Sequence, residues 1–137
     1  MAEFGYRSKS RLATCHQDII DLCLNVIDNY DFTVIWGYRS EREQNDCYDR
    51  GTSFKQFPLS KHNKNPSIAV DVAPWHAASP HHIRWNNERE FIFLAGRFMQ
   101  AADSMEIQIR WGGDWDMDDD LYDRNVPFDL GHFELMQ

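Results

Sequence analysis

Two histidines and one aspartate offer the side chains that a catalytic metal ion requires. His62 lies in a polar segment, Asp71 in an apolar run, and His132 close to the end of the chain. A catalytic zinc ion is held by three protein ligands that offer nitrogen or oxygen, and one position stays open for water. The three residues have the donor types and the number that such a site needs.

Asp71 is the most informative of the three because of its neighbours. It interrupts the apolar run at residues 68–74, which reads Ile-Ala-Val-Asp-Val-Ala-Pro. A carboxylate buried there without a partner would destabilise the fold, so it requires a metal ion, an arginine or several hydrogen-bond donors. A buried aspartate–arginine pair is therefore the alternative to a metal ligand. For a histidine taken alone, a surface or structural role is the more common one.

Hydrophobic periodicity predicts three helices. Apolar residues repeat at spacings of three and four over residues 12–29 and 91–102, which is typical of amphipathic helices. A further helix is predicted over about residues 40–51. Capping-box pairs mark the starts of two of these helices, Ser40 with Glu43 and Asn87 with Glu90.

Short runs of β-branched and aromatic residues predict strands between the helices. Because the strands are few and interleaved with helices, we expect an α+β fold with a small, mainly antiparallel sheet packed with about three helices. With 137 residues and 42% hydrophobic content, residues 1–137 should form a single domain. The predicted strands are residues 32–36, 68–73, 107–111 and 132–135.

Charge and cysteine content exclude several classes of protein. Lysine and arginine number 14 against 22 acidic residues, and the net charge of −8 disfavours a nucleic-acid partner. Cys15, Cys23 and Cys47 are odd in number and lack zinc-ribbon spacing, so we expect reduced thiols. No signal peptide, membrane span or stable membrane association is predicted.

Motifs are spread over most of the chain. They are Gly-Tyr-Arg-Ser at residues 37–40 with Gln44, Ser-Lys-His at 60–62 with Ala-Val-Asp at 69–71, Arg-Trp-Gly-Gly-Asp-Trp at 110–115, and Asp-Leu-Gly-His-Phe-Glu-Leu at 129–135.

Together these motifs resemble the zinc peptidase family that includes D-alanyl-D-alanine carboxypeptidases, dipeptidases and phage L-alanyl-D-glutamate endopeptidases. The resemblance implies a Hedgehog/D-Ala-D-Ala peptidase-like fold with zinc held by His62, Asp71 and His132. The family usually spaces the first histidine and the aspartate more closely, with a glycine between them. In this chain they are nine positions apart, and Ser67 stands in place of that glycine. The alternative ligands to His62 are His76, His81 and His82.

The resemblance also implies roles for two further side chains. Asp129, three positions before His132, occupies the place of the catalytic acid and base, as an aspartate instead of the glutamate of other branches. Glu134 is the rival, because in a strand it shares a face with His132, although a hydrogen bond to a metal-bound histidine would explain it equally well. Arg39 is expected to stabilise the developing oxyanion, and its alternative role is to pair with a surface carboxylate.

Two other signals bear on ligands. Alternating aspartates after residue 113 are similar to the start of a calcium loop, although Asp119 replaces the usual glycine and no glutamate closes the pattern. A solvated loop is the alternative to Ca²⁺ binding. Trp75 and Trp115 are candidates for the wall of a substrate groove. The candidate calcium ligands are Asp114, Asp116, Asp118, Asp120 and Asp123.

We therefore expect a zinc-dependent peptidase of the endopeptidase branch. The short chain, Asp129 and the Gly-Gly-Asp-Trp segment at residues 112–115 look like a monomeric phage endolysin. Its substrate would be the peptide stem of bacterial peptidoglycan. Made in the host cytoplasm, it would reach the cell wall after a holin opens the membrane. The alternatives are a D-alanyl-D-alanine carboxypeptidase or dipeptidase, and a zinc-binding module of the same fold without catalysis.

Overall fold

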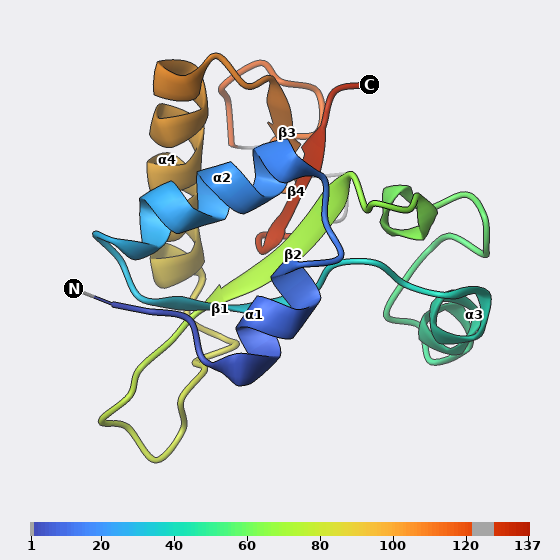
Figure 1. Cartoon of the computed structure of the whole chain (residues 1–137), viewed down its shortest axis with the longest axis horizontal. Coiled ribbons are helices and arrows are strands. Elements are labelled where there is room, and N and C mark those ends of the chain that lie inside the picture. The colour runs from blue at the N-terminus through green and yellow to red at the C-terminus, as the bar shows by residue number, and fades with distance from the viewer. Residues whose placement is uncertain (1, 122–127) are drawn as a thin grey trace.

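A computed structural model describes residues 2–121 and 128–137 of the chain. The helices and strands of these residues alternate along the sequence, as Figure 1 shows. In chain order they are α1 (Tyr6–Leu12), α2 (Gln17–Ile27), β1 (Phe32–Trp36), α3 (Glu41–Asp49), the short 3-10 helix η1 (Lys61–Asn63), β2 (Ala69–Pro74), α4 (Glu88–Met105), β3 (Ile109–Trp111) and β4 (His132–Leu135).

The described strands form one antiparallel sheet in the order β1-β2-β4-β3. The central pair, β2 and β4, comes from distant parts of the chain. Val70 and Val72 belong to the hydrophobic core, and Asp71 between them faces the opposite side because strand residues alternate. The expected α+β fold with a small antiparallel sheet is confirmed.

One face of the sheet is covered by the core. Helices α2 and α4 contribute most of the apolar side chains there, and Figure 1 shows α1 and α2 in front of the strands. Phe98 of α4 stacks on Phe133 of β4 with ring centroids 4.4 Å apart. Each such buried aromatic side chain contributes about 1.5–3 kcal/mol through removal of its surface from water. The core therefore anchors β2 and β4, which carry polar residues on their other face.

The helix predicted over residues 12–29 is present as α2 but begins only at Gln17, because the chain breaks between α1 and α2. Ser67 hydrogen-bonds on both sides of the break: His16 N donates to its carbonyl at 2.8 Å, and its own N–H donates to the Thr14 carbonyl at 2.9 Å. His16 then caps α2 by accepting from Asp18 N at 3.0 Å. These long-range bonds outweigh the helical periodicity and raise the described α-helices to four.

The two predicted capping boxes have different outcomes. At α3 the box is confirmed, since Ser40 Oγ accepts from Glu43 N at 3.2 Å and Glu43 Oε1 accepts from Ser40 N at 2.9 Å. At α4 the side chain of Asn87 makes no capping bond. The carboxylate of Glu90 is instead engaged by His76 and Arg84, at 2.8 and 2.9 Å. The side chain of Glu90 therefore pairs with the loop that follows β2 and does not cap α4.

Among the described residues, no helix has the length and apolar character required to cross a bilayer.

Gly131, directly before β4, lies against the backbone of β2. A Cβ there would collide with the carbonyl oxygen of Val72. The N–H of Val72 donates to the Gly131 carbonyl at 2.8 Å, so the two backbones are also joined by a hydrogen bond. We expect Gly131→Ala to lower the free energy of unfolding by about 2 kcal/mol. Gly96→Ala, in the open middle of α4, should raise it by about 1 kcal/mol. Urea denaturation measures both, and a neutral Gly131→Ala would contradict the close contact.

Candidate metal centre

The three candidate ligands converge on the sheet face that the core helices leave uncovered. Asp71 and His132 are direct partners across the β2–β4 ladder. His62 enters from η1, where Ser60 caps the helix by accepting from His62 N at 3.2 Å. One ligand atom of each residue lies within 4.8 Å of the others, so the group can hold a metal ion.

His62 is held with one ring nitrogen aimed at this group. Its Nδ1 lies 2.8 Å from the Gly37 carbonyl oxygen, which can only accept, so Nδ1 carries the proton in the neutral ring. The other nitrogen, Nε2, lies 3.2 Å from Asp71 Oδ2. It is buried and, within the described part of the chain, has no hydrogen-bond partner. A buried lone pair beside a carboxylate is what a metal ligand requires.

His132 is oriented by a carboxylate on each side. Nε2 lies 2.8 Å from Glu134 Oε1, and Nδ1 lies 2.9 Å from Asp71 Oδ1. Burial lowers the pKa of His132, but the hydrogen bonds with Asp71 and Glu134 outweigh it and raise the pKa to about 9. Glu134 therefore fixes the ring so that Nδ1 faces Asp71 and His62.

Asp71 is largely buried, with 16% of its side chain exposed. Burial raises the pKa of its carboxyl, but the neighbouring imidazole of His62 and the hydrogen bond with His132 hold it well below its usual range. Arg39 Nη2 also donates to Asp71 Oδ2 at 2.8 Å. The aspartate–arginine pair that the sequence left as an alternative is thus present together with the histidines.

Gln44 holds Arg39 in place, which explains why Gln44 belongs to the motif that contains this arginine. It is fully buried, and its Oε1 accepts from Arg39 Nη1 at 3.2 Å and from Asn63 Nδ2 at 3.3 Å. Its amide nitrogen donates to Ser53 Oγ at 2.9 Å and to the Lys55 carbonyl at 2.6 Å. One side chain therefore joins the arginine, η1 and the loop after α3.

Glu134 has contacts that fit an orienting role better than proton transfer. It is 4% exposed, and its Oε2 lies 2.8 Å from both Lys61 Nζ and Arg110 Nη2, while Oε1 engages His132. Burial raises the pKa of this carboxyl, but the bonds from His132, Lys61 and Arg110 hold it far below its usual range. Sequence reasoning missed Lys61 and Arg110, although Arg110 lies directly across the ladder from Glu134.

Asp129 lies at the edge of the same group and is accessible to solvent. Its backbone carbonyl accepts from His132 N at 3.1 Å, and its N–H donates to the Gly112 carbonyl at 2.9 Å. Shielding by neighbouring groups and the like charge of Asp71 raise the pKa of the Asp129 carboxyl, against the opposing charges of His132, His62 and Arg39. A carboxyl that holds its proton more readily suits an acid and base.

An open cleft of about 970 Å³ lies over this group. Arg39, Asp129 and Trp115 line it together with the three candidate ligands. The Trp115 ring lies 5.4 Å from the His132 ring, so this tryptophan is placed as predicted for a groove residue. Trp75 is not among the described residues that line the cleft and stacks instead on His82, with centroids 4.5 Å apart.

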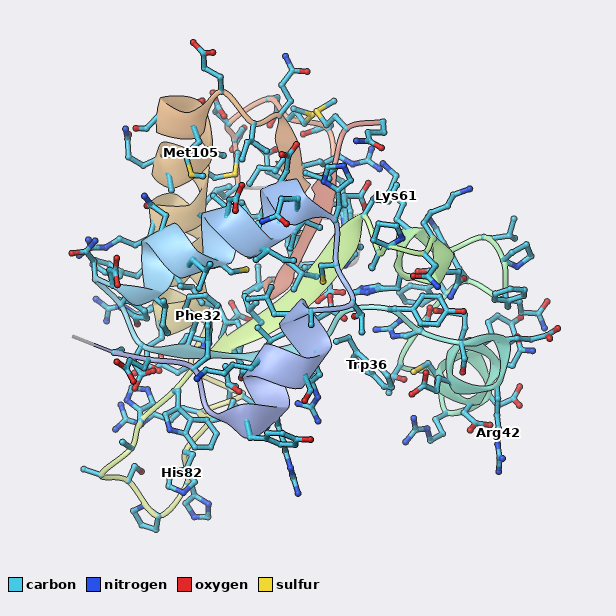
Figure 2. All side chains as sticks on the ribbon, in the orientation of Figure 1. Phe32, Trp36, Arg42, Lys61, His82 and Met105 are labelled. Atoms are coloured by element: carbon cyan, nitrogen blue, oxygen red, sulfur yellow. The ribbon has the colours of Figure 1, made fainter. Side chains whose placement is uncertain are left out.

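The alternative histidine ligands lie elsewhere. His76, His81 and His82 belong to the loop between β2 and α4, and His76 is paired with Glu90. Figure 2 shows His82 on this loop, far from Lys61, the neighbour of His62 in η1. The structure therefore joins His62, and none of these three, to Asp71 and His132.

The acidic segment forms a second group of carboxylates. Asp114, Asp116 and Asp118 each offer an oxygen within 4.8 Å of the others. Asp120 does not belong to this group, and its N–H donates to Asp118 Oδ1 at 2.8 Å. Asp123, the fifth predicted calcium ligand, lies outside the described residues.

Comparison with known proteins extends these observations. A family model described as phage L-alanyl-D-glutamate peptidase matches residues 1–136. The chain belongs to this family. It is 30% identical to the L-alanyl-D-glutamate peptidase of Escherichia phage T5, and the match covers 98% of each chain.

A solved structure has the same fold as this member of the phage peptidase family. It is the crystal structure of the L-Ala D-Glu endopeptidase ChiX of Serratia marcescens, with 24% sequence identity and a TM-score of 0.74. The match covers 98% of this chain and 90% of that one. Fold and family thus agree with the resemblance seen in the motifs.

Substitutions can distinguish a residue that binds the metal ion from one that only orients a ligand. We expect His62→Ala to lower the affinity for Zn²⁺ by more than a hundredfold, because it removes a ligand. Glu134→Gln should lower it by about tenfold, as is typical of a partner that only orients a ligand. His76→Ala, outside the group, is the control and should bind as the native protein does. Equilibrium dialysis at pH 7 measures all three, and unchanged binding by His62→Ala would exclude this site.

Proposed function

We propose that this protein is a zinc-dependent endopeptidase that hydrolyses the L-alanyl-D-glutamate bond of the peptidoglycan stem. The carrying observation is the buried Nε2 of His62, which has no hydrogen-bond partner in the described structure and faces Asp71 and His132 under an open cleft. Membership of the phage peptidase family and the activity named for the phage T5 relative support the choice of bond.

The donor set supports zinc. Two imidazole nitrogens and one carboxylate oxygen are typical of catalytic zinc, and the cleft leaves room for water and substrate. When bound, zinc would supply a water molecule of lowered pKa and polarise the scissile carbonyl. The contacts of Gly37 and Glu134 orient the two histidines for this purpose.

Asp129 and Arg39 would carry the remaining steps. Asp129 takes a proton from the attacking water as the carbon–oxygen bond forms, and passes it to the D-glutamate nitrogen as the carbon–nitrogen bond breaks. Arg39, which is 7% exposed and held by Gln44, stabilises the negative charge that develops on the carbonyl oxygen. Glu134 is committed to Lys61, Arg110 and His132, which supports Asp129 as the acid and base.

We further propose that residues 1–137 act as one catalytic domain and as a monomer. As a phage endolysin, the protein would reach the cell wall once the host membrane has been opened by a holin.

The decisive experiment is mass spectrometry of purified peptidoglycan treated with the protein, with and without a zinc chelator. We expect new L-alanine carboxyl ends and D-glutamate amino ends that disappear on chelation. Release of free D-alanine would instead indicate a carboxypeptidase or dipeptidase, and no new ends would indicate a zinc-binding module. Asp129→Asn tests the acid and base separately from metal binding: turnover should fall by about 10²–10⁴-fold while zinc stays bound. Full turnover by this variant would transfer the role to Glu134.

A second cation site is supported by the acidic segment. Asp114 is 9% exposed, and its Oδ1 is buried without a hydrogen-bond partner in the described structure, beside the carboxylates of Asp116 and Asp118. Met117 and Asp119 adopt positive φ values of 59° and 62°, which turn the chain around this group. Carboxylate oxygens gathered by a tight loop favour Ca²⁺.

Calorimetry tests the calcium site separately from zinc. With the zinc site saturated, we expect Ca²⁺ to bind with measurable heat and Asp116→Asn/Asp118→Asn to remove that heat. Asp18→Asn, on the surface of α2, is the control for lost negative charge. Absence of calcium heat in the native protein would leave the segment as a solvated loop.

A further inference from the structure

The cleft over the metal centre has two chemically different ends. The segment from α3 to η1 lines one end with positively charged side chains and with the exposed ring of Phe54. The start of α4 and the segment before β4 line the other end with aromatic side chains. The basic residues are Arg50, Lys55 and Lys61, and the aromatic residues of the other end are Trp85, Phe91 and Phe128.

The basic end stands out in a chain whose net charge is −8. Arg50 and Lys55 are exposed, whereas Lys61 is engaged by Glu134. The main chain of Lys55 is fixed by the 2.6 Å hydrogen bond from Gln44, which also holds Arg39. A flexible lysine head on a fixed backbone can meet a carboxylate of a ligand bound in the cleft.

The aromatic end presents an open ring. Trp85 is 60% exposed, and it is stacked on Phe91 with centroids 6.1 Å apart and planes inclined by 26°. Phe91 is 6% exposed, and its ring lies 3.5 Å from the position that a Cβ of Gly131 would occupy. Gly131 precedes His132. One phenylalanine ring therefore separates Trp85 from the residue next to a metal ligand.

Charge also differs between the two ends. Glu88 lines the cleft at the start of α4, three positions after Trp85, so an anion is disfavoured there. A neutral ligand with an apolar face suits Trp85 better than a carboxylate does.

The peptidoglycan stem has a matching asymmetry. On the amine side of the L-alanyl-D-glutamate bond, the D-glutamate and the residues that follow carry free carboxylates. On the acyl side, L-alanine is joined through a lactyl ether to a muramyl sugar that has no charge at this attachment. The C–H face of a sugar ring packs against an aromatic face in the same way as other apolar groups.

We propose that the cleft binds its substrate in one direction, with the muramyl sugar on Trp85 and the peptide carboxylates toward Lys55 and Arg50. This inference rests on the proposed function. An L-alanine and a lactyl group span about 7 Å when extended, so the sugar lies at a distance from the reacting bond and needs a binding surface of its own. Trp85 is then a specificity residue that favours stems still attached to glycan.

The test compares kcat/KM for a muramyl stem peptide and for the same peptide without the sugar, using the zinc-loaded protein. The native protein should prefer the sugar-bearing substrate, and Trp85→Ala should lower that preference about tenfold. Trp85→Phe, which keeps an aromatic face, should retain most of it. Phe93→Ala is the control, since Phe93 is 55% exposed on α4 but lies outside the cleft.

The direction of binding needs a second substrate pair, one with D-glutamate and one with its uncharged D-isoglutamine form. Lys55→Gln should lower the preference for the carboxylate about threefold, as expected for an exposed charge pair. It should not change the preference for sugar. If Lys55→Gln changed the sugar preference and Trp85→Ala the carboxylate preference, the direction would be reversed.

The outcomes separate this inference from the proposed function. If the native protein cleaves neither substrate, the proposed function fails. If it cleaves both with equal kcat/KM, the endopeptidase stands and the sugar site is overturned. Thermal melting by circular dichroism shows whether each variant is folded.

Discussion

The carboxylate of Asp71 on the uncovered face of the sheet is the constraint on which the rest of the site depends. It contacts His62, His132 and Arg39 at 3.2, 2.9 and 2.8 Å. A largely buried carboxylate without such partners would be strongly destabilising. The contact with His132 exists because the two residues are paired across β2 and β4. A slip of one residue in this register would turn Asp71 into the hydrophobic core.

Around this carboxylate, each functional group is held in place by a hydrogen-bond partner. The Gly37 carbonyl holds His62, Glu134 holds His132, and Gln44 holds Arg39. The partners are in turn supported, since Glu134 is anchored by two cations and Gln44 by the loop after α3. Such support allows side chains to keep the geometry that catalysis needs without rearrangement during the reaction.

One face of the sheet contributes to stability, and the other carries the polar residues of the site. Helices α2 and α4 bury one face with apolar side chains, and the polar residues gather on the other, where the cleft admits a substrate. Successive side chains of β4 point to opposite faces of the sheet. Phe133 packs in the core, and His132 and Glu134 on either side of it belong to the site. The small sheet therefore supports a polar cluster without weakening its own core.

The amino-acid sequence by itself determined the class of fold, the candidate ligands and the start of α3. Each of these depends on local patterns: strand alternation, the Ser40 capping box, and the conflict between Asp71 and its apolar neighbours. The motifs also pointed to the family that the comparisons establish. These features could be predicted because their physical causes lie within a few residues of chain.

Only the tertiary structure decided which side chains meet. It shortened the first predicted helix through bonds to Ser67, turned Glu90 from a cap to a partner of His76, and surrounded Glu134 with Lys61 and Arg110. It also placed Trp85 in the cleft and turned Trp75 away from it. These outcomes depend on strand register and on contacts between residues far apart in the chain. Local composition carries no information about such pairings, because their energies arise only when the strands and loops come together.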